Sequence, residues 1–289
     1  MTKQPGLLRL LNDASSPYRD PLARLHWEGL DLDRWWLPPH ALSLSGVEEF
    51  ESVAPALCRR LSHCEYLHAL QVGLGLKSLF MRQISGALDR SATAVQSRYL
   101  HEIREKAGHN LMFLELMDRS GIRIPASHPH RPRFSALFSR WVHTDSALFW
   151  ALAVIAEELP DKLNRAVRQM SDTVPVCAVV YHLATLQVMD ETRHIALARA
   201  NCEDVSQRLS SWQRLVQSPM LSWFLRTVAR NLFFPPAAVY EAAGFDRPRA
   251  WQELAKANLV RRRFAEHAVK PTLDFLRDQG WRIRSLRKL

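Results

Sequence analysis

The sequence has few cysteines, and none of them form a pair typical of a small disulfide or zinc fold. The 4 cysteines, Cys58, Cys64, Cys177 and Cys202, are scattered and include no Cys-x-x-Cys motif. Without such a framework, a reducing compartment is the expected location. The sequence also lacks an apolar run long enough to span a bilayer, and its first residues do not form a secretory signal. We therefore expect a cytoplasmic protein with no membrane partner.

Strand-like alternation, a glycine-rich phosphate loop and internal repeats are also missing. The chain instead carries apolar residues at three- and four-residue spacing, which is the pattern of amphipathic helices. This predicts an all-α fold, with Gly121 as the C-cap of one helix. The expected helices lie at about 47–61, 64–84, 92–119, 145–158, 160–170 and 175–200, and later helices are interrupted at Pro235-Pro236, Gly244 and Pro271.

The composition of the chain changes along its length. Residues 1–45 are rich in proline, tryptophan and turn formers, and we expect them to form an arm packed on the core. Residues 46–204 carry the long helical segments of a bundle. Residues 205–289 add further helices and a basic tail to the same domain. With 47% apolar residues in a chain of 289, the sequence can bury one large core.

Acidic residues are outnumbered, since 29 Asp and Glu stand against 39 Lys and Arg, for a net charge of +10. The basic residues are spread over the helices and concentrate only at Arg261–Arg263 and Arg282–Lys288. No strip of aromatic and basic residues and no nucleic-acid motif accompanies them. We therefore expect no nucleic-acid partner. The excess positive charge suits solvated faces, or the docking of an acidic partner such as a carrier protein.

The most informative stretch runs from Val188 to Ala196, where Glu191 and His194 stand three residues apart in an apolar helical segment. This spacing places both side chains on one face of a helix. Glu-x-x-His pairs of this kind face inward in helix-bundle carboxylate metal sites, where other helices supply more glutamates. Solvated surface pairs have the same spacing, so the interpretation depends on partners from other helices.

Two other predicted helices supply such partners. The segment Glu105–Phe113 contains Glu-Lys-Ala-Gly-His, and Ala156-Glu157-Glu158 ends an almost unbroken apolar run. Together with Asp190-Glu191-Thr192-Arg193-His194, these stretches resemble the non-haem di-iron N-oxygenases, which convert aryl amines to nitro compounds in natural-product pathways. The resemblance covers most of the chain after Gly46. It implies a ferritin-like four-helix bundle.

The resemblance also implies a set of iron ligands. In that family the first helix supplies one glutamate, the second Glu-x-x-His, the third one glutamate and the fourth His-x-x-x-Glu-x-x-His. Carried over position by position, the pattern implies metal ligation by His109, Glu157, Glu191 and His194. The implied cofactor is one or two iron ions.

Three positions depart from the family pattern. Lys106 replaces the glutamate of the second helix, and Gln187 replaces the first histidine of the fourth. On the first helix the ligand position falls on Lys77 or Gln71, and the acid Glu65 lies nearly a helix length away. A charged ammonium has no lone pair, so Lys106 cannot ligate iron.

Neighbouring acids offer one way to complete the site. Glu105 could compensate for Lys106, because a spacing of four from His109 is also one helix face, and Glu102 lies on that same face. Such a rescue would shift the ligand by one residue, or about 100° around the helix axis. We keep both glutamates as candidates.

A buried salt-bridge network is a different interpretation of the same substitutions. Lys106, and also Lys77 if it points inward, would then pair with Glu157 and Glu191 in place of metal. Such a network is tolerated only if every member is paired. A buried lysine with carboxylate neighbours also has a perturbed pKa, which makes Lys106 a candidate for acid-base or imine chemistry.

Plainer interpretations apply to single residues. His109 and His194 could be core histidines with satisfied hydrogen bonds, and Lys106 could extend to solvent. Gln187 could be an ordinary buried hydrogen-bonding residue, and Glu158 is expected on the surface. Two more histidines, His128 and His130, lie in a proline-rich loop and are not expected to bind metal.

These observations lead to two hypotheses of function. The first is an iron oxygenase that oxidises an amine or a carbon centre of a small molecule. The second is a divergent member with a single metal or none, which runs other chemistry or serves in a biosynthetic complex. Candidate catalytic positions are the substituted ones, Lys106, Glu105 and Gln187. Both hypotheses imply a small-molecule substrate in natural-product metabolism, and a homodimer is common in this fold.

Overall fold

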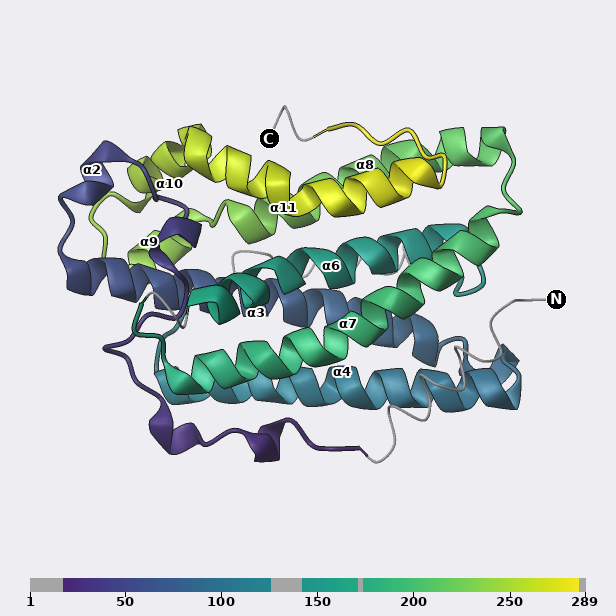
Figure 1. Ribbon diagram of the computed structural model, residues 1–289, viewed down its shortest axis with the longest axis horizontal. Helices are drawn as coiled ribbons and strands as arrows, with labels where there is room; N and C mark the ends of the chain where they lie inside the picture. The colour runs from purple at the N-terminus through teal and green to yellow at the C-terminus, as the bar shows by residue number, and fades with distance from the viewer. Residues whose placement is uncertain (1–17, 126–141, 171–173, 286–289) are drawn as a thin grey trace.

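The computed structural model describes residues 18–125, 142–170 and 174–285 (Figure 1). These residues are mostly helical. They contain no strand, and only an isolated bridge joins Trp35 to Val176. The predicted all-α fold is therefore confirmed. None of the described helices is long and apolar enough to cross a membrane.

Four long helices form the bundle: α3 (Pro55–Ser85), α4 (Thr93–Ser120), α6 (Ala147–Met170) and α7 (Ala178–Ser206). Figure 1 shows α3 and α6 in the middle of the molecule and α4 below them, while α7 rises obliquely from the level of α4 at the left to that of α6 at the right. The most extensive pairing joins α6 to α7, and α3 packs on α4. The ferritin-like bundle expected from the resemblance is the one observed. The C-cap prediction for α4 is also confirmed, because Gly121 adopts the left-handed conformation with φ of 64°.

The first helix of the bundle is longer than the sequence indicated. Separate helices were expected at 47–61 and 64–84, but the structure has a short α2 (Glu48–Glu51) and then one unbroken α3. Pro55 begins α3 at a position where its missing N–H costs nothing. No glycine or proline interrupts residues 61–64, and Leu61 and Cys64 are fully buried on a continuous face.

Two proline positions were predicted wrongly as helix breaks. Pro160 lies inside α6, so the helices expected at 145–158 and 160–170 are one. Pro271 lies inside α11 (Leu259–Asp278). An internal proline removes one backbone hydrogen bond and costs about 3 kcal/mol. Buried neighbours on both sides offset that cost in α6, where Leu159 and Leu163 pack in the core.

The C-terminal helices cover one side of the bundle. They are α8 (Ser211–Phe233), α9 (Ala237–Ala243), α10 (Pro248–Ala257) and α11, and α8 and α11 pack along α6 on the side away from α4 (Figure 1). The breaks predicted at Pro235-Pro236 and Gly244 are confirmed. Gly244 is the left-handed C-cap of α9, with φ of 95°.

The described part of the N-terminal arm lies across the bundle in three short 3-10 helices, Leu22–Arg24, Trp27–Gly29 and Pro39–Ala41. Trp36 is fully buried with its ring 4.6 Å from that of His63. The backbone N–H of Ser43 donates to Glu65 at 3.0 Å, which ties that carboxylate to the arm. Glu65 is therefore used in fixing the arm and is absent from the site below. The proposed boundaries at 45 and 204 stay a prediction.

Candidate functional site

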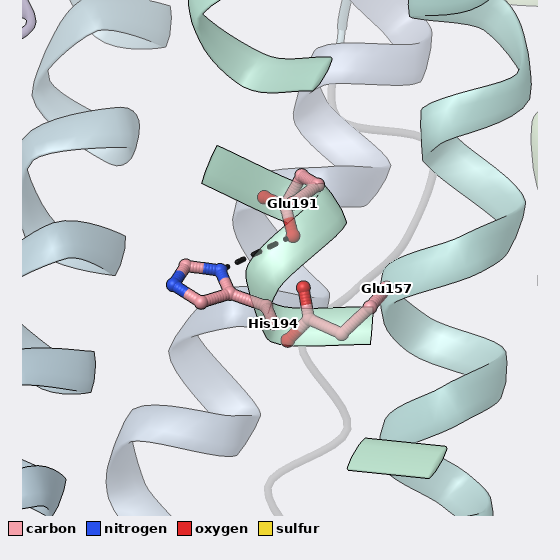
Figure 2. Close-up of side chains that lie close together, drawn as sticks. All are labelled: Glu157, Glu191 and His194. Carbon is pink, nitrogen blue, oxygen red and sulfur yellow. Dashed lines mark hydrogen bonds and ion pairs between the residues drawn. The ribbon is translucent and has the colours of Figure 1, made fainter. Parts of the chain in front are cut away.

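The fourth bundle helix, α7, presents the predicted pair to the interior. Nδ1 of His194 lies 3.4 Å from Oε2 of Glu191, as expected for residues one turn apart. Both side chains are buried. Figure 2 shows them facing Glu157, which comes from α6. The inward orientation rules out a solvated surface pair.

Two lysines bind these glutamates from the other helices. Nζ of Lys106 on α4 donates to Oε1 of Glu157 at 2.5 Å. Nζ of Lys77 on α3 donates to Oε1 of Glu191 and lies 3.9 Å from Oε2 of Glu157. All four helices of the bundle therefore meet in one cluster of two ammonium groups and two carboxylates.

Lys106 is the most enclosed member of this cluster. Its relative exposure is 0%, so the interpretation in which it extends to solvent is wrong. Its Nζ also lies 3.6 Å from Oε2 of Glu102 and 3.5 Å from Nδ1 of His194, and 4.9 Å from the ring centre of Phe80. The ammonium is thus held by acids on two helices and by an aromatic face.

The first-helix position is Lys77 rather than Gln71. The side-chain amide of Gln71 instead donates to the carbonyl of Ile124 at 3.4 Å, away from the cluster. These contacts decide between Lys77 and Gln71, the two positions that the sequence left open.

Glu105 and Glu102, which the sequence offered as replacement metal ligands, contact His194 instead. Oε2 of Glu105 lies 2.7 Å from Nε2 of His194, and Oε2 of Glu102 lies 3.8 Å from the same atom. Glu105 also accepts from Nη2 of Arg193 at 3.3 Å. These acids hold the outer nitrogen of His194, while Lys106 stays beside Glu157. Neither takes the place of the missing glutamate.

His109 sits on the opposite flank of Glu191. Its Nδ1 lies 3.5 Å from Oε1 of Glu191, and its Nε2 lies 3.0 Å from Oδ2 of Asp190. Arg193 completes this edge by donating to Oδ1 of Asp190 at 3.0 Å. Sequence reasoning gave no role to Asp190 or Arg193, although both belong to the stretch that carries the motif.

A small cavity adjoins the lysine side of the cluster. Its polar lining includes Lys77, Glu157, Asp161, Gln187 and Glu191, and it has room for about one water molecule. Among the described residues, Gln187 Nε2, Glu157 Oε2 and Asp161 Oδ1 are buried without a hydrogen-bond partner. Buried polar atoms of this kind usually bind water or a ligand. Lys106 and Glu105 do not line this cavity. Asp161 does line it, although the sequence gave no indication of a role for this residue.

The charges in the cluster stabilise one another. Burial alone would lower the pKa of His194, but Glu102 and the bonds to Glu105 and Glu191 raise it to about 10. Burial also disfavours the charged form of Lys106, yet Glu157, Glu102 and Glu191 raise its pKa above the ordinary value. Both groups are therefore cationic at neutral pH.

The two central glutamates have different acidities. Burial and the neighbouring Glu191 raise the pKa of Glu157. Burial would also raise the pKa of Glu191, but Lys77 and the bonds to Glu157 and the two histidines hold it well below the ordinary value. Within the pair, Glu157 therefore takes up a proton more readily than Glu191.

The residues present do not fit a two-iron centre. Glu157, Glu191 and His194 each offer one ligand atom, and these atoms lie within 4.8 Å of one another. However, the Lys106 ammonium contacts two of those three side chains, and the Lys77 ammonium contacts the third. Two positive groups therefore stand where cations would bind, and they repel a dication.

Glu158, the neighbour of Glu157, was expected on the surface, and that prediction is wrong. Its side chain is buried and pairs with Arg199 on α7, and Thr272 on α11 donates to its Oε2 at 2.6 Å. The cost of burying the carboxylate is offset by these two partners. His128 and His130 lie outside the described residues.

Comparison with known proteins agrees with this architecture. A family model described as "P-aminobenzoate N-oxygenase AurF" matches residues 4–280. Uncharacterized proteins of Mycobacterium bovis and Mycobacterium tuberculosis are each 24% identical to the chain over 242 residues, which covers 81% of this chain and 68% of each relative. The match spans nearly the whole chain and agrees with the resemblance carried by the helix motifs. The chain belongs to the p-aminobenzoate N-oxygenase AurF family.

Proposed function

We propose that this chain is a metal-independent member of its di-iron family, in which a buried network of lysine, glutamate and histidine replaces the two-iron centre. The observation that carries the proposal is the position of the Lys106 ammonium, 2.5 Å from Glu157 and 3.5 Å from Nδ1 of His194. Lys77 makes the equivalent contact with Glu191. The family's name suggests the oxidation of an amine, and this set of residues does not support that oxidation by a two-iron centre.

The balance of charge supports the same proposal. The carboxyl groups of the described network are those of Glu102, Glu105, Glu157, Asp190 and Glu191, and its cations are Lys77, Arg98, Lys106, Arg193 and His194. At the centre of the network the ammonium groups of Lys77 and Lys106 face the carboxyl groups of Glu157 and Glu191, so these four groups can balance one another without metal. Iron would add a buried excess of positive charge, which is costly in a low-dielectric interior.

The cavity beside Lys77 indicates where such a network could act. Lys77 brings an ammonium to it, Glu157 and Asp161 bring carboxylate oxygens, and Gln187 brings an amide. We infer proton transfer through a bound water as the chemistry that this lining supports, because the cavity has room for about one water molecule. Of the predicted catalytic positions, only Gln187 is part of this lining. Lys106 and Glu105 lie outside the lining, where they pair with Glu157 and His194.

The wider setting is part of the same proposal. We place the protein in cytoplasmic small-molecule metabolism of the natural-product type, as a homodimer. The net charge of +10 supports delivery of the substrate by an acidic carrier protein.

One iron held by Glu157, Glu191 and His194 is the second candidate. It is favoured by the closeness of their ligand atoms, within 4.8 Å of one another. A metal ion at this point would have to displace the Lys106 ammonium from Glu157. The two candidates therefore differ in whether metal binds to the folded protein at all.

Thermal unfolding with and without metal separates them. A ligand that binds only the folded protein raises its stability by about 2.7 kcal/mol at 100 times its Kd. We expect the same unfolding temperature in EDTA, in anaerobic Fe²⁺ and in Mn²⁺, with Mg²⁺ as the control for ionic strength. A rise of several degrees in Fe²⁺ or Mn²⁺ but not in Mg²⁺ would overturn the metal-independent proposal and support the single-iron site.

A further inference from the structure

Helix α8 carries a stripe of large apolar side chains on its outer surface. Trp212 is 70% exposed and Val216 is 58% exposed, and Trp223 and Leu215 are also exposed. Trp212, Val216, Pro219 and Trp223 are spaced by four, three and four residues, so they line one face of the helix. The side of α8 that faces the core is apolar as well. The outer stripe is therefore additional to the packing face.

The C-terminal segment runs along the edge of this stripe. The backbone N–H of Arg282 donates to Oγ of Ser218 at 2.9 Å, and that of Arg284 donates to Oγ of Ser222 at 3.3 Å. Both arginine side chains are exposed. Figure 1 shows this segment beside α8 at the rim of the molecule, on the side away from α4. The backbone of both arginines is thus held along α8, at Ser218 and Ser222.

Negative charge is missing from this part of the chain. No Asp or Glu occurs between Asp204 and Glu241, and none follows Asp278. The same stretches contain Arg226 and Arg230 on α8 in addition to the two arginines of the tail. The α8 face, defined as the stripe Trp212–Trp223 with Arg282 and Arg284, therefore combines apolar and basic groups without an acid.

We propose that the α8 face docks on an anionic lipid surface. A helix that lies in the plane of a membrane interface inserts tryptophan and aliphatic side chains, while flanking arginines bind acidic headgroups. The exposed tryptophans supply the interfacial side chains. The arginines supply charge complementarity, because the stretches of sequence that carry them contain no Asp or Glu. A second copy of this chain fits less well, because it would bring like charges together.

This proposal does not depend on the absence of metal from the bundle, since the α8 face belongs to the C-terminal helices. It also revises the expectation of no membrane partner. That expectation rested on the absence of apolar runs long enough to span a bilayer, and a helix that lies on the membrane surface needs no such run.

Vesicle co-sedimentation of the full chain tests the proposal. The probes are vesicles of equal parts phosphatidylglycerol and phosphatidylcholine, and vesicles of phosphatidylcholine alone. We expect binding to the anionic vesicles, little binding to the neutral ones, and release as the salt concentration rises. The variant Trp212→Gln with Val216→Gln should bind at least about tenfold more weakly, because both side chains lose apolar burial.

The chain offers a matched control on another surface. Leu111 and Leu114 of α4 are 54% and 51% exposed, and Leu111→Gln with Leu114→Gln should leave vesicle binding unchanged. Circular dichroism checks that every variant is folded. Equal binding to both vesicle types, absence of binding, or equal losses in the two variants would overturn the proposal. So would a dimer, seen by light scattering, that the Trp212 and Val216 variant alone dissociates.

Discussion

Nζ of Lys106 lies 2.5 Å from Oε1 of Glu157 at the centre of the bundle. The lysine stands at the position where the family pattern calls for a glutamate, so it reverses the charge there. The partner carboxylate stays where the pattern places it. One substitution can therefore keep the bundle packed around a charged centre while changing what that centre binds.

Removing the Lys106 charge should strongly destabilise the fold. Lys106→Met leaves Glu157 and Glu102 without their shared cation, and breaking a buried pair in this way costs about 3–5 kcal/mol. Urea unfolding followed by circular dichroism measures the loss.

Two variants define the cause of that loss. Lys270→Met removes an exposed lysine that pairs with Asp274 and should cost less than about 1 kcal/mol. Adding Glu157→Leu to Lys106→Met removes both partners and should restore part of the stability. Wild-type stability in Lys106→Met would show that the network is not what balances these carboxylates.

Restoring the family residues should create a metal site. Lys106→Glu together with Gln187→His removes one ammonium and adds a carboxylate and an imidazole beside Glu157, Glu191 and His194. We expect the unfolding temperature of this variant to rise on addition of Mn²⁺ or Fe²⁺, and that of the wild type to stay constant. Failure of the variant to bind either metal would mean that positions 106 and 187 do not occupy the ligand register assigned to them.

Much of this site was predictable because helical spacing is local. The spacing of Glu191 and His194 fixes their common face, and the side chains of His109, Glu157 and Lys106, which the family register selected, lie around that face. The choice between Lys77 and Gln71 was not predictable, because it depends on the rotation of α3 in the bundle. The roles of Asp190 and Arg193 depend on the distance between α4 and α7, which no single helix encodes.

The fold was predictable to a similar depth. The four bundle helices and the ends at Gly121 and Gly244 follow from periodicity and from glycine in the left-handed conformation. Pro160 and Pro271 misled the prediction, since local rules make proline a helix breaker and take no account of burial on both sides. The surface position expected for Glu158 was also wrong, because its partners Arg199 and Thr272 come from other helices and cannot be read from the local sequence.

The stability of the protein should depend on pH through His194. Its pKa is about 10 in the folded protein, against an ordinary value of 6.5. A group with a raised folded pKa contributes its full stabilisation below the unfolded pKa and loses it as the pH rises through the folded pKa. The free energy of unfolding should therefore fall between pH 7 and pH 10, by on the order of a few kcal/mol.

A substitution on the same helix isolates that contribution. His194→Gln should flatten the fall between pH 7 and pH 10, whereas His182→Gln, at an exposed position of α7, should leave the slope unchanged. Equal slopes in the wild type and in His194→Gln would contradict the assignment of a charged His194 held by Glu102 and Glu105.

We propose above that the Lys77 and Lys106 ammonium groups take the place of iron. The most direct measurement is the iron content per chain of protein expressed in iron-replete medium and purified without chelator, determined by inductively coupled plasma mass spectrometry. We expect iron at trace level in the wild type. Two iron ions per folded chain would contradict it.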